Sequence, residues 1–168
     1  MANLWDNSNV PHNRGWTCIA VYDVREDGCS AEEATYETCE MCGKEQIRYV
    51  HIMQHEEHSD LNVGYICACK MSNDYVGPKQ RERRLRNKAA RRVTWLNKQW
   101  RTSKEGNPYL TIEGFNVGVF ANRWKLGRWS YRIGGTFSKD NYATEHEAKL
   151  ALFDEFWEIH SARKQKVE

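Results

Sequence analysis

Four cysteines in two close pairs are the residues of this chain best suited to chemistry. Cys39 and Cys42 stand three positions apart with Gly43 directly after them, and Cys67 and Cys69 follow about 25 residues later. Two thiols at this spacing on a tight turn can aim their sulfurs at one ion, and a second thiol cluster can complete a tetrahedral site. The pattern predicts a structural zinc site with Cys39, Cys42 and Cys67 as ligands.

The fourth ligand of this site has more than one candidate. Cys69 carries the nearest thiol and ranks first, although a C-x-C pair is tight for two ligands of one ion. His51, on a strand expected to face the same hairpin, ranks second, and His55 lies just beyond it. Cys18 and Cys29 are expected to be bystanders, in a core and in a loop respectively.

The run His55-Glu56-Glu57-His58 raises the separate question of a catalytic metal. Its histidines are three positions apart in an expected hairpin loop, whereas the H-E-x-x-H motif of metalloproteases lies on a helix. A solvated polar loop is therefore the favoured interpretation. We expect no catalytic residues, and a metal-dependent hydrolase is the weakest of the function classes considered.

A strongly basic segment follows the cysteines. Residues 79–104 hold eleven Lys or Arg and one acid, Glu82, so their local charge of +10 leaves −8 for the rest of a chain whose total is +2. Apolar residues recur there at helical spacing, which predicts one amphipathic helix over 78–102 that starts at Pro78. The expected apolar stripe is Leu85, Ala89, Val93 (or Arg92), Leu96 and Trp100.

This charge density indicates a polyanionic partner. Like charges along a helix repel, and Glu at i,i+4 normally relieves them. We therefore expect phosphate contacts from Arg83, Arg84, Arg91 and Arg92 to DNA or RNA. An acidic protein partner, or docking on the acidic remainder of this chain, is the alternative. A membrane partner is disfavoured because the apolar stripe is thin and contains Ala.

The last part of the chain reads as strand, strand, strand, helix. Gly114 and residues 125–127 indicate turns between pleated runs at 115–120 and 129–133. Residues 144–147, Thr-Glu-His-Glu, form a capping box at a helix start. The face of that helix expected to be buried comprises Ala148, Ala151, Leu152, Phe156 (or Glu155) and Ile159.

Alternation along residues 128–133 separates two faces of the expected sheet. Arg128, Ser130 and Arg132 share one face, and Trp129 and Tyr131 lie on the other. A sheet face that carries arginine can enter a major groove. An antiparallel sheet with one packed face and one face in water is an equal alternative.

The predicted fold class is α+β, in four parts. Residues 1–76 form a zinc module with a strand at 18–22 and a hairpin of strands 46–53 and 61–66, joined by a polar connection at 55–60. Residues 77–104 form the basic helix. Residues 105–160 form a three-stranded antiparallel sheet with one packed helix, and the tail 161–168 frays.

Composition narrows the functional classes. A hydrophobic fraction of 40% with 12% aromatic residues predicts folded cores rather than disorder. No apolar run approaches the roughly 20 residues of a membrane span, and the polar first residues do not read as a secretory signal. These features predict a cytoplasmic protein with reduced thiols. The sequence predicts a non-enzymatic, zinc-stabilised nucleic-acid-binding protein, with an inhibitor or adaptor module as the alternative.

Nearly the whole chain resembles a family of uncharacterised small bacterial and phage zinc-finger-like proteins. The resemblance covers residues 11–157 and is carried by the C-x-x-C-G run at 39–43, Ile-Arg-Tyr-Val-His at 47–51, and Val63-Gly64 with Cys67-Ala68. It implies a zinc module and no particular activity. The family favours Cys at the position of Tyr65, whereas this chain has Tyr65 and an extra Cys69.

The third part is also similar in layout to the plant ethylene-response-factor type DNA-binding domain. The matching residues are Gly127-Arg128-Trp129, Ile133, Thr144, Glu147-Ala148 and Ala151. Such domains bind DNA through the sheet. The resemblance therefore implies Arg123, Arg128 and Arg132 as DNA contacts.

Overall fold

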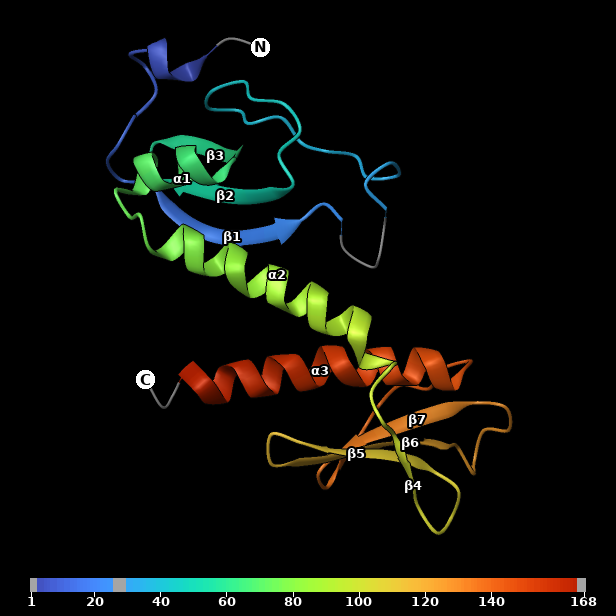
Figure 1. The fold of residues 1–168 in the computed structure, drawn as a ribbon. Helices are drawn as coiled ribbons and strands as arrows, with labels where there is room; N and C mark the ends of the chain where they lie inside the picture. The colour runs from blue at the N-terminus through green and yellow to red at the C-terminus, as the bar shows by residue number, and fades with distance from the viewer. Residues whose placement is uncertain (1–2, 26–29, 166–168) are drawn as a thin grey trace. The chain divides into compact units, whose positions relative to one another are not determined.

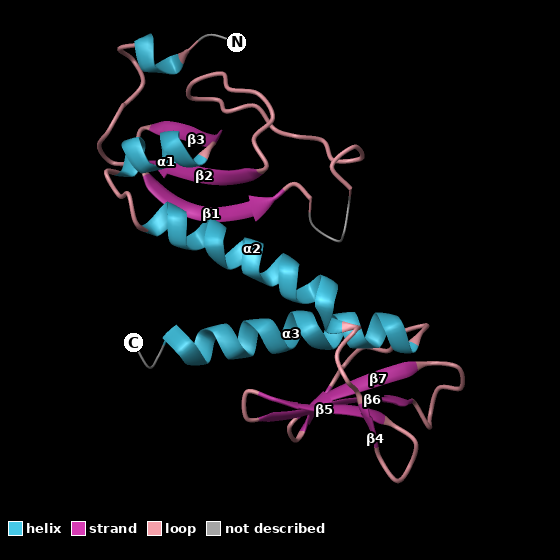
Figure 2. Cartoon of the chain, in the orientation of Figure 1, coloured by secondary structure: helices cyan, strands magenta, loops and turns pink. Residues whose placement is uncertain are grey.

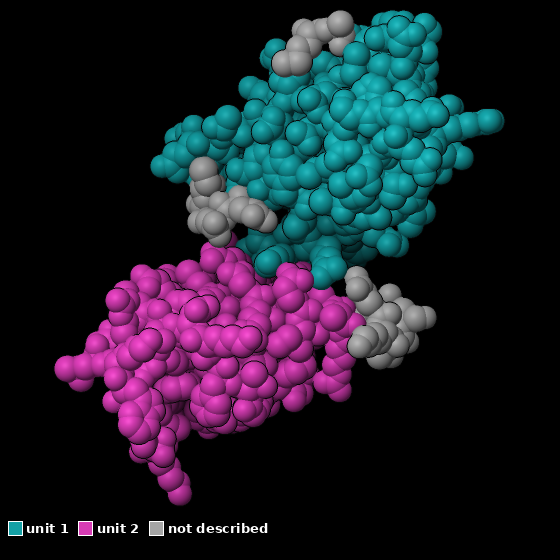
Figure 3. All heavy atoms as spheres, turned by 180° about the vertical axis from the view of Figure 1, so that it is seen from behind, with its two compact units in different colours: residues 1–89 teal, residues 90–168 magenta. Residues whose placement is uncertain are grey.

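The computed structural model describes residues 3–25 and 30–165. Within them the chain forms two compact units, residues 1–89 and residues 90–168 (Figure 3). Each unit contains its own antiparallel sheet and its own helix packed on it (Figures 1 and 2). The mixed α and β content expected from the sequence is confirmed. The boundary falls inside the basic helix, α2 (Gly77–Trp95), so that this helix contributes residues to both units.

The first unit is built on a three-stranded sheet in the order β1 (Thr17–Asp23), β2 (Tyr49–His55) and β3 (His58–Val63). Helix α1 (Tyr65–Ser72) packs against β1 and β2. The central strand is buried on both faces, because consecutive residues Tyr49, Val50 and His51 are all inaccessible.

Strand β2 ends later than the predicted residue 53, and strand β3 begins earlier than the predicted residue 61. The predicted connection at 55–60 is largely strand, since His55 pairs with His58. Gly64, directly after β3, has an extended backbone and caps α1, and its carbonyl accepts a hydrogen bond from the Ala68 amide at 3.0 Å. Tyr65 and Ile66 consequently begin α1 instead of continuing the strand.

The predicted basic helix ends earlier than expected. After Trp95 the chain turns, and residues 101–102 join a sheet as β4 (Arg101–Thr102). Val93, placed in the expected apolar stripe, is 71% exposed, whereas Trp95 is 1% exposed. The expected apolar stripe is therefore not carried by one helix, because Leu96 and Trp100 lie beyond the end of α2.

The second unit contains a five-stranded antiparallel sheet in the order β4 to β8, with β5 (Pro108–Ile112), β6 (Phe115–Ala121), β7 (Trp129–Ile133) and β8 (Thr136–Phe137). Three strands were predicted. β7 has the bounds expected, and the two edge strands β4 and β8 are each only two residues long, too short for alternation to reveal.

Helix α3 (Glu145–Gln165) covers one face of this sheet, over β6 and β7. The Thr144 hydroxyl accepts a hydrogen bond from the Glu147 amide at 3.1 Å, which is the predicted cap. The buried face of the helix differs from the prediction, because Ile159 is 39% exposed while Phe153, Trp157 and His160 are buried. The helix also continues past 160 to Gln165, so the frayed tail was predicted too long; residues 166–168 lie outside the described part.

Candidate metal centre and sheet-face hollow

Three of the predicted ligands meet in the first unit. Cys39 and Cys42 lie on a turn in which the Gly43 amide donates to the Cys39 carbonyl at 2.7 Å, and Gly43 adopts a φ of 71° that glycine accommodates without strain. Cys67 lies in the first turns of α1. The three sulfurs all lie within 4.8 Å of one another, and Cys39 and Cys67 are buried. This group can hold a metal ion.

Hydrogen bonds prepare the Cys39 sulfur for the thiolate form. The Cys67 thiol donates to it, and the amides of Gly64 (N to Sγ 3.4 Å) and Cys42 donate as well. Together they outweigh burial and lower the pKa of Cys39 to about 5. The same shared proton, together with burial, raises the pKa of Cys67. Thiolates are the form that binds a soft metal, and backbone donors of this kind stabilise such ligands.

The sequence did not reveal a further group at this site, the indole of Trp5. Its N–H donates a hydrogen bond to the sulfur of Cys67. The short 3₁₀ helix Leu4–Asp6 that carries it is held by a bond from the Leu4 amide to the Met41 carbonyl, 2.9 Å long. The segment Leu4–Asp6 therefore lies beside the thiol group, although the sequence around it carries no signal for this role.

The first-ranked fourth ligand, Cys69, is not brought into the group. Two positions along an α-helix rotate a side chain by about 200°, so Cys67 and Cys69 point to different sides of α1. The Cys69 sulfur instead contacts the Tyr65 hydroxyl. Within the described residues the thiol group has three members. Cys29, expected to be a bystander, lies outside the described residues, and Cys18 is a core residue as predicted.

The two alternative histidine ligands are engaged elsewhere. His51 is fully buried, with Nδ1 3.8 Å from the Cys18 sulfur and Nε2 3.4 Å from Oε1 of Glu82. The His55 ring packs against Trp16 at 5.0 Å, and its Nδ1 accepts a hydrogen bond from the Glu57 amide at 3.0 Å. These contacts give both histidines a structural role in the fold.

Two of the four helix arginines expected to meet phosphate are paired within the second unit. Arg92 forms a fork on Asp154, with Nε 3.2 Å from Oδ1 and Nη2 3.3 Å from Oδ2. Arg91 pairs with Glu113 at 3.2 Å, and its guanidinium lies 5.6 Å from the Trp157 ring centroid. The other two lie in the first unit, where Arg83 is exposed and Arg84 is half-buried. Fewer positive charges of the helix are therefore available to a polyanionic partner than the sequence suggests.

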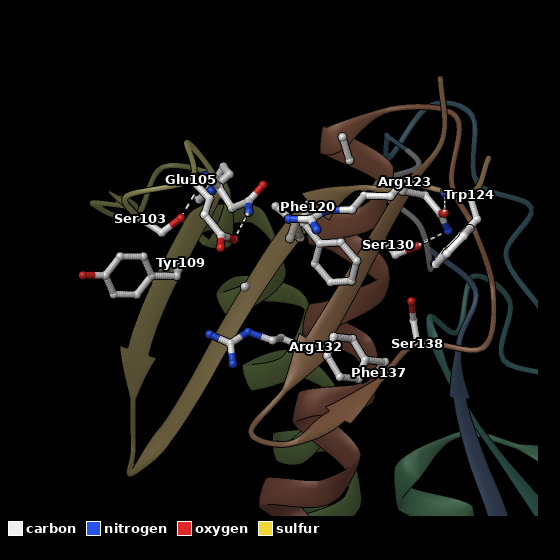
Figure 4. A pocket seen from close by; sticks show the side chains of 16 residues that line it. Ser103, Glu105, Tyr109, Phe120, Arg123, Trp124, Ser130, Arg132, Phe137 and Ser138 are labelled. Carbon is white, nitrogen blue, oxygen red and sulfur yellow. Dashed lines mark hydrogen bonds between the residues drawn. The ribbon is translucent and has the colours of Figure 1, made fainter. Parts of the chain in front are cut away.

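The face of the second sheet that α3 does not cover contains a hollow of about 1020 Å³. Figure 4 shows the residues around it, which come from β5 to β8 and from the loops beside them. Among the lining residues are two of the predicted sheet contacts, Arg123 and Arg132, while the third, Arg128, is exposed outside the hollow. The rest of the lining that bears on function is aromatic: Tyr109, Phe120, Trp124 and Phe137.

Comparison with known proteins adds no relative. No family model matches the chain, and neither a curated protein nor a solved structure matches it. No helix in the described part of the chain is long and apolar enough to cross a membrane.

Proposed function

We propose that this chain is a non-enzymatic, zinc-stabilised nucleic-acid-binding protein. The observation that carries the proposal is the hollow on the sheet of the second unit, where Arg123 and Arg132 stand among aromatic rings and Glu105 is the one acid of the lining. Guanidinium groups suit phosphate, and aromatic side chains suit bases. The combination is more specific for nucleic acid than the charge of the helix alone.

Zinc is the metal that best fits the first unit. A group of three cysteine ligands, two of them buried, favours soft or borderline ions over magnesium or calcium, which prefer oxygen ligands. A small unit with a three-stranded sheet gains folding free energy from such a site. Zinc would thus stabilise the first unit and leave binding to the surfaces of both units.

The basic helix offers a second surface for a polyanion, and this surface comprises fewer residues than the sequence predicted. Arg83 and the neighbouring cations Lys79 and Arg81 are exposed on the part of α2 that belongs to the first unit. These groups support phosphate contacts and equally the alternative of an acidic protein partner. We assign them an auxiliary role, because the part of α2 that carries them contains no aromatic residue of its own.

A binding titration over a range of salt concentrations tests this proposal. Fluorescence anisotropy with labelled DNA and RNA should give an affinity whose logarithm falls linearly with the logarithm of salt concentration. Arg132→Gln should weaken binding, and Leu126→Ala, a fully exposed apolar residue in the neighbouring loop, should not. Absence of binding to every nucleic acid at low salt would overturn the proposal and bring the acidic protein partner to first place.

A further inference from the structure

One row of side chains runs across all five strands of the second sheet. The pairing register joins Arg101 to Tyr109, Tyr109 to Gly118, Gly118 to Arg132, and Arg132 to Phe137. Residues directly opposite each other on antiparallel strands point to the same face of a sheet. Since the neighbours of Gly118 in β6, Val117 and Val119, are buried in the core with α3, the row lies on the open face.

Glycine at the centre of this row leaves the floor of the hollow flat. A Cβ at Gly118 would lie 3.2 Å from the Pro108 carbonyl oxygen and 3.4 Å from the Tyr109 Cβ. Because residue 118 is glycine, no side chain stands between Tyr109 and Arg132 in the row. Glycine inside a strand often marks a place where another group approaches the backbone closely.

Aromatic rings on this face remain in water at an energetic cost. Phe137 is 62% exposed and meets Phe120 edge to face, with ring centroids 5.7 Å apart. Trp124 is 94% exposed at the rim of the hollow. Exposed aromatic groups gathered at one hollow indicate a partner that covers them.

Trp124 is presented by a well-defined turn. The side-chain oxygen of Asn122 accepts hydrogen bonds from the Trp124 amide at 2.9 Å and from the Lys125 amide at 3.1 Å. The Asn122 amide in turn donates to the Arg128 carbonyl at 2.7 Å. These hydrogen bonds order the backbone from which the exposed indole projects.

Two arginines, Arg132 and Arg123, line the hollow together with these rings. Arg132 stands between Gly118 and Phe137 in the row, and its Nη2 lies 3.4 Å from Oδ1 of Asn116. Arg123 enters from the loop beside Phe120 (Figure 4). The volume of the hollow, about 1020 Å³, lies at the upper end of the range for ligand pockets, about 300–1,000 Å³, so it is large enough to take a nucleotide.

We propose that this open sheet face binds single-stranded nucleic acid, stacking unpaired bases on Phe137, Trp124 and Tyr109 with Arg132 and Arg123 on the phosphates. The inference rests on the proposed function and names its substrate class. A duplex hides the faces of its bases and shows only their edges in the grooves, so exposed rings on a protein gain little from it. Unpaired bases offer their faces to aromatic side chains.

The test compares labelled oligonucleotides in anisotropy titrations of the full chain. The probes are single-stranded 12-nucleotide DNA and RNA and a hairpin duplex containing the same sequence. We expect the parent to bind a single strand at least tenfold more tightly than the duplex. Phe137→Ala and Trp124→Ala should each weaken single-strand binding by about 5- to 150-fold, the range for loss of one stacked base, and change duplex binding little.

Two controls separate stacking from folding. Phe137→Trp keeps a ring at the same place and should retain affinity, and Leu126→Ala removes an exposed apolar group without a flat face and should change nothing. Duplex binding equal to or tighter than single-strand binding would overturn this inference while leaving the proposed function in place. Failure to bind any of the probes would overturn both.

Discussion

Nε2 of His51 lies 3.4 Å from Oε1 of Glu82, the single acid within the +10 segment of residues 79–104. His51 is fully buried in the central strand of the first sheet, and Glu82 is on α2. A second contact of Glu82, 3.4 Å to Arg86, lies along the helix. Because Arg86 also lies 5.0 Å from the Tyr49 ring, these residues fasten the start of the basic helix to its own unit.

Glu82→Ala should therefore destabilise the first unit. It leaves buried His51 without its partner on the helix, and a buried polar group that loses its partner costs about 1–3 kcal/mol. Urea unfolding of the full chain measures the change. Glu45→Ala removes an exposed acid of the same unit and should stay within about 0.5 kcal/mol of the parent. Equal stability of the two variants would mean that the His51–Glu82 contact contributes nothing.

Metal binding should depend on three cysteines and no others among those described. We expect about one zinc per chain, lost in Cys39→Ser, Cys42→Ser and Cys67→Ser and retained in Cys69→Ser and Cys18→Ser. Atomic emission gives the content, and the cobalt-substituted protein should show sulfur-to-metal absorption that persists in the last two variants. Loss of metal from Cys69→Ser would restore Cys69 as a ligand.

Arg92→Ala and Arg83→Ala should separate structural from binding roles on one helix. Arg92 forks onto Asp154, so its loss should lower the free energy of unfolding by roughly 1 kcal/mol, a modest figure because both groups are partly in water. Arg83 is exposed, and its loss should affect salt-sensitive nucleic-acid binding more than stability. The reverse pattern in thermal melts and titrations would refute this division.

Acid should weaken the partly buried ion pair of Asp23 and Arg48 at the edge of the first sheet. Burial disfavours the Asp23 carboxylate, but two hydrogen bonds from Arg48 at 2.9 and 2.8 Å and one from the Arg25 amide overcome it and hold the pKa of Asp23 below its usual 3.8. A group with a lowered pKa stabilises the fold above its unfolded value and stops doing so as pH falls through its folded value.

The stability difference between the parent and Asp23→Asn should accordingly be full at neutral pH and shrink below about pH 3.8. Parallel urea titrations of both proteins at several pH values measure it, and effects common to both, such as metal loss in acid, cancel in the difference. A gap that stays constant down to pH 2 would rule out ionisation of Asp23 as its source.

Features with a short range along the chain were predictable from the residues alone. The spacing of Cys39 and Cys42 indicates a turn that could hold a metal ion, because a turn is formed by neighbours. Thr144 marks the start of α3 for the same reason, since its hydroxyl caps an amide three residues away. The bounds of β7 follow from alternation over five residues that pair with a strand of similar length.

Features that depend on distant partners were decided only by the tertiary structure. The contacts of Trp5 with Cys67 and of His51 with Glu82 join residues far apart in the chain, and local sequence patterns do not predict them. Arg91 and Arg92 read as free charge in the sequence, yet acids far along the chain neutralise them. The row from Arg101 to Phe137 exists only because the register of four strand pairs aligns residues spread over the whole sheet. Register and long-range pairing are set by the packing of whole elements. The residues of the row are visible in the sequence, but the sequence alone therefore does not show that they share one surface.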